Sequence, residues 1–188
     1  MKRRRWPLLL LLVLLKTAAA YGQQQEETDP RAARRAVGLR AGSWQDLPYA
    51  EIYFQRGLAE RVALENSLGV WRRKQGTWTT YVIPLLTTVK FYPLTAPARA
   101  LQPYVMVGLG LGVGVESESK QAVGGGGTSI LTALGGKAAG GLEFKLRKSL
   151  HAHGGARYLY MHYNDKLAFR NTYDGIGFEG GISYRFSF

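Results

Sequence analysis

Three histidines are the residues best suited to chemistry, and all lie within the segment 150–164. His151 and His153 are two positions apart, so in a strand both side chains point to the same face. Two imidazoles at this spacing can bind a metal ion, but a zinc site normally has three or four ligands. No third ligand is evident nearby in the sequence. We therefore expect two polar side chains near the end of a strand, and no metal or cofactor site.

His162 offers a second chemistry, because a histidine can act as the general base for a hydroxyl nucleophile. It belongs to RYLYMHYND, which is followed by NTYDGIGFE. These segments resemble lipid A deacylase, a barrel enzyme in which a histidine and a serine two residues later work with an acidic residue on the next strand. Asp174 or Glu179 would orient the base, but Asn164 stands where the serine is needed. An amide cannot replace that hydroxyl, so we expect no enzyme and keep a membrane hydrolase using His162 as the alternative.

A run of three basic residues, Arg72, Arg73 and Lys74, directly follows Trp71. Arginine and lysine donate charge-assisted hydrogen bonds to phosphate, so the run is a candidate phosphate contact. A solvated loop is the alternative, since most basic residues are exposed in any protein.

The elements that position these residues are strands, because apolar and polar residues alternate with a period of two. The clearest case is 175–188, and 104–115 and 134–147 repeat it. Successive side chains of a strand point to opposite faces, so each segment has one apolar face and one small or polar face. A helix would scatter these residues around its circumference.

Weaker alternation predicts five further strands, and turn residues separate all eight. The predicted strands are 36–45, 48–57, 61–73, 77–92, 104–115, 134–147, 150–164 and 175–188. Eight strands joined in sequence favour an all-β, antiparallel, up-and-down barrel. Among the connections at the end of the barrel opposite the two termini, 116–129 and 164–172 are the best candidates for external contacts.

Alternation alone does not say which face points outward. The interior of an eight-stranded barrel is narrow and filled by side chains, so glycines and paired charges suit it. We therefore expect the apolar face to meet lipid, as in a transmembrane barrel, and a charge network to fill the lumen. Its predicted members are Arg40, Glu51, Glu65, Lys90, Lys137, Glu143, Lys145, Arg157, Glu179 and Arg185. A small-solute channel is the alternative, although open aqueous pores come with about 16–18 strands.

Aromatic residues near the expected strand ends predict two girdles at the membrane interfaces. One set is Trp44, Tyr49, Trp71, Trp78, Tyr163 and Tyr173, and the other is Phe91, Tyr92, Tyr104, Phe186 and Phe188.

The first 20 residues are typical of a secretory signal peptide. A basic start is followed by the apolar run 8–15 and then by small residues at 18–20, with Gly22 as a second possible end. Removing 1–20 takes away five basic residues, so the net charge of the 188-residue chain falls from +12 to +7. Much of the basicity therefore belongs to targeting and does not indicate nucleic-acid binding. Residues 21–35 are interpreted as a flexible leader, and 36–188 as the barrel domain. The chain has no cysteine, which excludes disulfides and thiolate metal sites.

The chain resembles the small bacterial outer-membrane β-barrel proteins of the OmpA, OmpX and OmpW type over about 36–188. The segments that carry the resemblance are VIPLLTTVKFYPL (82–94), QPYVMVGLGLGVGV (102–115) and DGIGFEGGISYRFSF (174–188). In that family a last strand ending in Phe resembles the signal read by the barrel-assembly machinery. The positions that match this alternation are Ile182, Tyr184, Phe186 and Phe188.

The resemblance implies a bacterial outer-membrane location. We expect a non-catalytic protein with a structural or surface-interaction role, a monomer without a cofactor. Its expected partners are the barrel-assembly machinery, membrane lipid and lipopolysaccharide, whose phosphates Arg72, Arg73 and Lys74 would contact.

Overall fold

The computed structural model describes residues 35–45, 47–94, 101–118, 128–167 and 170–186. The predicted signal peptide, the predicted leader up to residue 34, and Phe188 lie outside these residues.

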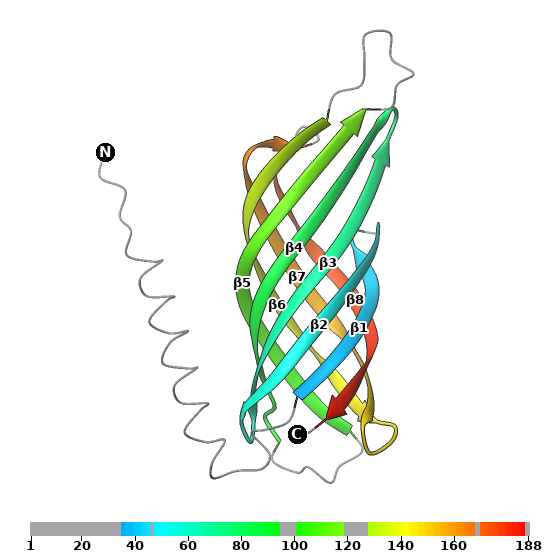
Figure 1. Cartoon of the computed structure of the whole chain (residues 1–188), viewed down its shortest axis with the longest axis vertical. Coiled ribbons are helices and arrows are strands. Elements are labelled where there is room, and N and C mark those ends of the chain that lie inside the picture. The colour runs from blue at the N-terminus through cyan, green and yellow to red at the C-terminus, as the bar shows by residue number, and fades with distance from the viewer. Residues whose placement is uncertain (1–34, 46, 95–100, 119–127, 168–169, 187–188) are drawn as a thin grey trace, which may run out of the picture.

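Eight strands form a closed antiparallel barrel in which each strand pairs with its neighbours in sequence and β8 pairs with β1 (Figure 1). The strands are β1 (Arg35–Trp44), β2 (Leu47–Ala59), β3 (Val62–Gln75), β4 (Trp78–Phe91), β5 (Leu101–Glu118), β6 (Thr128–Lys145), β7 (Leu150–Leu167) and β8 (Arg170–Phe186). The predicted all-β, eight-stranded, up-and-down architecture is therefore confirmed. No helix in the described part of the chain is long and apolar enough to cross a membrane.

The two rims of the barrel differ in height. We call the end where β1 begins and β8 ends the terminal rim, and the opposite end the distal rim. At the distal rim the β1–β2 hairpin stops well below β3 to β6 (Figure 1). Pairing of β1 with β8 ends at Gly42 and Glu179, so β8 continues past the hairpin. There, Nε2 of Gln45 donates a hydrogen bond to the carbonyl of Asp174 on β8, at 2.6 Å.

The distal ends of the later strands are longer than the sequence pattern predicted. β5 and β6 extend through residues 118 and 128, and β7 and β8 through 167 and 170. The described ends of the predicted loops 116–129 and 164–172, namely 116–118, 128–129, 164–167 and 170–172, are therefore strand, whereas 119–127 and 168–169 lie outside the described residues. The alternation fades at these ends because polar residues occupy the outer face there, where Asn164, Asp165 and Lys166 are exposed.

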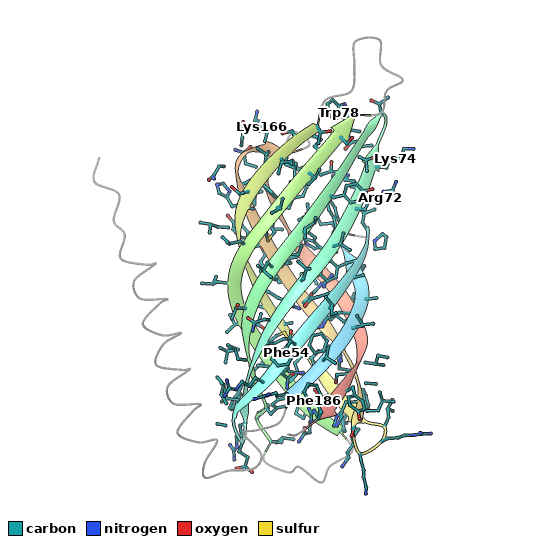
Figure 2. The ribbon with its side chains drawn as sticks, viewed as in Figure 1. Phe54, Arg72, Lys74, Trp78, Lys166 and Phe186 are labelled. Carbon is teal, nitrogen blue, oxygen red and sulfur yellow. The ribbon has the colours of Figure 1, made fainter. Side chains whose placement is uncertain are left out.

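The two faces of each strand have opposite character. Outward-facing Leu109, Phe178 and Ile182 are 56%, 70% and 52% exposed, whereas inward-facing Glu179 is 4% exposed. Apolar side chains cover the outer wall around the whole barrel (Figure 2). Soluble monomers rarely expose a contiguous apolar patch larger than a few hundred Å², so this wall needs an apolar surrounding.

The β3–β4 turn illustrates local control of the register. Only Gly76 and Thr77 separate the two strands. Gly76 has φ 61°, a left-handed conformation that glycine adopts without a Cβ clash. Two-residue hairpins with such a glycine match the twist of the paired strands, and Gln75 pairs directly with Trp78.

Candidate functional site

The middle of the barrel holds six charged side chains that no solvent reaches. Arg40, Lys137 and Arg157 are the cations, and their side chains are fully buried. The carboxylates are Glu51, Glu65 and Glu179, contributed by β2, β3 and β8. We call these six residues the central network. Three positive and three negative charges balance, so ion pairing offsets part of the desolvation cost of burying them.

Each member of the central network contacts partners from other strands. Arg40 Nη2 lies 2.7 Å from Glu65 Oε2, and its Nη1 lies 3.2 Å from Glu51 Oε1. Lys137 Nζ lies between Glu51 and Glu179, at 3.3 and 3.4 Å. These ion pairs connect strands on opposite sides of the lumen, so they tie the wall together through its centre.

Aromatic rings extend the central network toward both rims. The guanidinium carbon of Arg157 lies 3.5 Å from the centroid of the Tyr49 ring, and that of Arg40 lies 4.2 Å from Tyr53. The hydroxyl of Tyr49 also donates a hydrogen bond to Glu51. Cation–π contacts of this kind are strongest when the cation has lost its water.

A second cluster of charges, centred on Glu143, lies nearer the terminal rim. Glu143 pairs with Lys90 at 2.9 Å, with His151 at 3.3 Å, and with Arg185. The hydroxyl of Tyr92 donates to the same carboxylate at 3.1 Å. We call this cluster the terminal network, and it has more cations than carboxylates.

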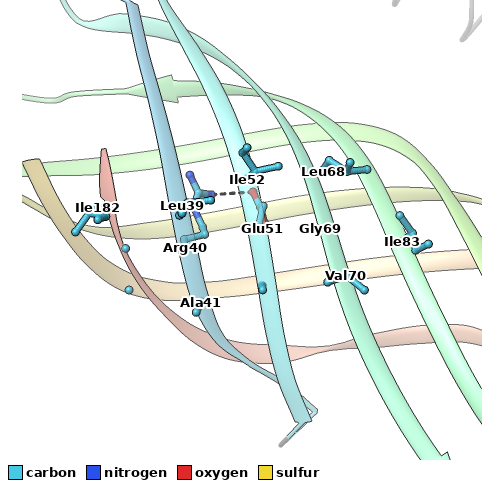
Figure 3. A pocket seen from close by; sticks show the side chains of 13 residues that line it. Leu39, Arg40, Ala41, Glu51, Ile52, Leu68, Gly69, Val70, Ile83 and Ile182 are labelled. Atoms are coloured by element: carbon cyan, nitrogen blue, oxygen red, sulfur yellow. Dashed lines mark hydrogen bonds and ion pairs between the residues drawn. The ribbon is translucent and has the colours of Figure 1, made fainter. Parts of the chain in front are cut away.

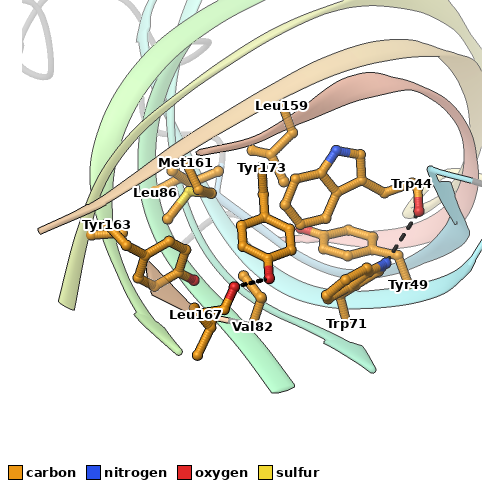
Figure 4. Close-up of a cluster of buried hydrophobic side chains, with 11 residues drawn as sticks. Trp44, Tyr49, Trp71, Val82, Leu86, Leu159, Met161, Tyr163, Leu167 and Tyr173 are labelled. Carbon is orange, nitrogen blue, oxygen red and sulfur yellow. Dashed lines mark hydrogen bonds between the residues drawn. The ribbon is translucent and has the colours of Figure 1, made fainter. Parts of the chain in front are cut away.

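The distal half of the lumen is filled by an apolar and aromatic cluster, which we call the distal plug (Figure 4). Its members are Trp44, Tyr49, Trp71, Val82, Leu86, Ala133, Leu159, Met161, Tyr163, Leu167 and Tyr173. The Trp44 and Trp71 rings lie 5.3 Å apart, and Trp71 Nε1 donates to the Trp44 carbonyl at 3.1 Å. Together with the two networks, the plug fills the lumen with side chains.

The distal plug corrects the prediction of two aromatic girdles. Trp44, Trp71, Tyr163 and Tyr173 have no exposed surface, and they point inward. Other predicted girdle residues are also buried, namely Tyr49, Tyr92 and Tyr104. Phe91 is exposed on the outer wall, and Trp78 and Phe186 are partly buried. The cause is spacing, because each inward aromatic residue lies an even number of positions from an inward neighbour on its strand.

Glycines on the inner face of β5 make room for the plug. A Cβ atom on Gly112 would lie 2.0 Å from Met161 Cε, and one on Gly114 would lie 2.4 Å from Leu167 Cδ2. Large side chains of β7 therefore occupy the space that a side chain of β5 would need.

The structure places nine of the ten predicted lumen charges in the two networks. The exception is Lys145, which is exposed at the terminal rim. Lys145 shares its face with Glu143, but it is the last residue of β6, at the rim of the barrel. The prediction that Lys145 belongs to the lumen network is therefore wrong.

The catalytic candidates are divided between the two faces of the wall, since His162 and Asp174 are exposed and Glu179 is buried. His162 is on the outer face, where its Nδ1 lies 3.1 Å from Thr172 Oγ1. Glu179 faces the lumen and is engaged by the central network, so it cannot orient His162. Asp174 accepts a hydrogen bond from Tyr158 at 3.1 Å. Asn164 is exposed.

The other two histidines face the lumen and are buried. His151 contacts Glu143, and Nδ1 of His153 lies 3.4 Å from the Tyr53 hydroxyl. Within the described ranges, no group of three or more His, Cys, Asp or Glu residues is arranged to hold a metal ion.

The basic run and the predicted assembly signal lie at opposite ends of the barrel (Figure 2). Arg72 and Lys74 are exposed on the outer face near the distal rim, whereas Arg73 alternates inward and is partly buried. Ile182 and Tyr184 are exposed on the outer face of β8, and Phe186 is partly buried.

Sequence reasoning missed several residues that complete the lumen. Gln55 donates to the Tyr92 hydroxyl, and Tyr53 packs against Arg40 and His153. The signal that identifies them is their spacing, since Tyr53 and Gln55 lie two and four positions after Glu51.

Comparisons with solved structures find the same architecture. The crystal structure of the N-terminal β-barrel domain of Pseudomonas aeruginosa OprF matches with a TM-score of 0.52 at 13% identity, over 82% of this chain and 98% of that one. The chain has the fold of small outer-membrane β-barrels. Neisserial surface protein A matches with a TM-score of 0.54 at 13% identity, over 82% of this chain and 95% of that one.

A major outer membrane protein from Thermus thermophilus matches with a TM-score of 0.55 at 12% identity, over 81% of this chain and 99% of that one. No protein-family model matches the chain, and the search of curated proteins gave no significant match. At these identities the likeness concerns the fold. The resemblance stated from the sequence is thus confirmed at that level.

Proposed function

We propose that the protein is a bacterial outer-membrane barrel with a structural or surface-interaction role and no catalytic activity. The signal peptide would export it, and Ile182, Tyr184, Phe186 and Phe188 would present the last strand to the barrel-assembly machinery. The outer wall would then meet lipid, and closure of the barrel would satisfy the strand edges within the membrane.

The observation that carries this proposal is the filled lumen. Six buried charges at the centre and eleven plug residues beyond them occupy the lumen of the described barrel. A channel needs an open polar interior, and barrels with water-filled pores have about 16–18 strands. We therefore favour a barrel that acts through its surface over one that conducts.

The surface that would act is the distal rim. β3 to β8 rise above the β1–β2 hairpin there, and they carry exposed polar and basic side chains, among them Arg72, Lys74 and Lys166 (Figure 2). Arginine and lysine at this level are suited to the phosphates of lipopolysaccharide.

Two measurements on the same preparation test the proposal. Membrane fractionation should recover the protein with the outer membrane, and its mobility on a gel should change when the sample is boiled. Planar bilayers containing the folded protein should show no steady conductance. A reproducible open state would contradict the filled lumen, and recovery with the soluble fraction would contradict the membrane location.

A further inference from the structure

A shallow groove of about 600 Å³ crosses the outer wall of β8, β1, β2, β3 and β4 (Figure 3). Three small outward-facing residues, Ala41, Ala50 and Gly180, form the floor of the groove. The strand register explains the hollow, because Ala41 pairs with Ala50 on one side and with Gly180 on the other. No large side chain rises between these strands at that level.

Large apolar side chains border the groove. They are Leu39, Ile52, Leu68, Val70, Ile83 and Ile182. Arg40 and Glu51 also line it, but both face the lumen and their charges are paired with each other there. The groove therefore presents an almost wholly apolar surface, which suits a hydrocarbon chain.

Two exposed cations stand directly beyond the groove on its distal side. Val70, Arg72 and Lys74 alternate along β3 and share the outer face. At about 3.3 Å per residue, Arg72 lies roughly 7 Å past Val70 along the strand. The Arg72 guanidinium carbon is 5.8 Å from the centroid of the Tyr81 ring, which holds it over the outer wall. A phosphate next to these cations would place an attached acyl chain at the groove.

We propose that this groove binds one acyl chain of a lipid A molecule, and that Arg72 and Lys74 bind a phosphate of the same molecule. The inference rests on the proposed outer-membrane location. The lipid is specified as lipid A, and the predicted phosphate contact is reduced to Arg72 and Lys74, since Arg73 alternates to the inner side. The apolar groove and the two neighbouring cations together match an acylated, phosphorylated glycolipid.

Native mass spectrometry of the purified, folded protein tests the proposal, with lipid A, dephosphorylated lipid A and phosphatidylglycerol as probes. We expect lipid A to be retained best. Replacing Arg72 and Lys74 by Ala removes two cations, and Ala50→Phe fills the groove while leaving the lumen intact. Loss of the two cations should weaken lipid A retention roughly five-fold or more, the scale of one cation near a membrane surface, and Ala50→Phe should weaken it as well.

Two matched controls should retain lipid A as the wild type does. Arg147→Ala with Lys148→Ala removes two exposed cations at the terminal rim, and Ala156→Phe enlarges an exposed residue of β7 outside the groove. Unchanged retention in Ala50→Phe, or equal retention of phosphatidylglycerol, would overturn the proposal.

The fractionation result separates this inference from the proposed function. Suppose that the wild type and variants reach the outer membrane and shift on boiling. A lipid A retention result that contradicts the groove then overturns only the groove proposal, and the proposed function stands. If the wild type does not reach the outer membrane, both proposals fail.

Discussion

Arg40 and Glu65 form a fully buried ion pair, with Arg40 Nη2 2.7 Å from Glu65 Oε2. The two residues come from β1 and β3, which are separated by β2 in the wall. Their side chains therefore meet across the interior, and Arg40 also reaches Glu51 and Glu179. This position makes Arg40 the cation with the most carboxylate partners in the central network.

Replacing Arg40 by Met should lower the free energy of unfolding by about 3–5 kcal/mol, because it leaves carboxylates buried without a full set of partners. Urea unfolding in detergent micelles measures this change. The double variant Arg40→Met with Glu65→Leu restores equal numbers of charges and should regain part of the loss. Lys145→Met is the matched control, and it should change stability by less than about 0.5 kcal/mol. Equal losses for Arg40→Met and Lys145→Met would contradict the central network.

The contact between Gly112 and Met161 gives a second prediction. Gly112→Val should destabilise the barrel by about 1–3 kcal/mol, because its side chain enters the space that Met161 fills. Met161→Ala should relieve the clash, so the double variant should be less destabilised than the two single changes predict when added. A double-mutant cycle from urea unfolding measures this coupling. Strict additivity would show that the two residues do not compete for space.

Two substitutions of Trp71 separate the contribution of packing to the stability of the distal plug from that of the hydrogen bond. Trp71→Phe removes the hydrogen bond to the Trp44 carbonyl and should cost about 1 kcal/mol. Trp71→Ala also removes the ring from a fully buried site and should cost about 3–5 kcal/mol. Thermal or urea unfolding gives both values. A negligible effect of Trp71→Ala would mean that the ring is not packed in the lumen.

Mass spectrometry of lipid A tests the hydrolase alternative. Cells with the wild-type gene, cells with His162→Ala and cells without the gene should contain lipid A with the same number of acyl chains. The reason is the geometry, since Asn164 stands where a nucleophile is needed and Glu179 faces the lumen. Loss of one chain that depends on His162 would establish catalysis instead.

The period of two allowed most of the fold to be predicted from the sequence. It placed Glu179 and Ile182 on opposite faces, and the structure agrees. The same period could also have placed the aromatic residues, because Trp44 lies four positions from Arg40 and Tyr173 lies six from Glu179. The girdle prediction gave more weight to residue type than to spacing, and for this reason it was wrong.

The depth of a residue along the barrel axis and the partner that it meets in an ion pair could not be predicted from the period of two. Lys145 and Glu143 share a face, yet only Glu143 is buried, because alternation fixes a face and not a height. Which carboxylate meets Arg40 depends on the register of three strands and on the stagger of the barrel. The groove at Ala41, Ala50 and Gly180 also depends on register, since these residues are far apart in the sequence.

The absence of native cysteine makes site-directed spin labelling the most direct test of which face meets lipid. Single cysteines at Leu109, Phe178 and Ile182 on the outer wall, and at Ser183 in the lumen, would carry the label in reconstituted membranes. We expect labels on the outer wall to collide with dissolved oxygen and not with a water-soluble nickel complex, whereas a label at Ser183 is shielded from both. Free access of the nickel complex to labels at positions 178 and 182 would show that the apolar wall does not face lipid, and would contradict the membrane-spanning barrel.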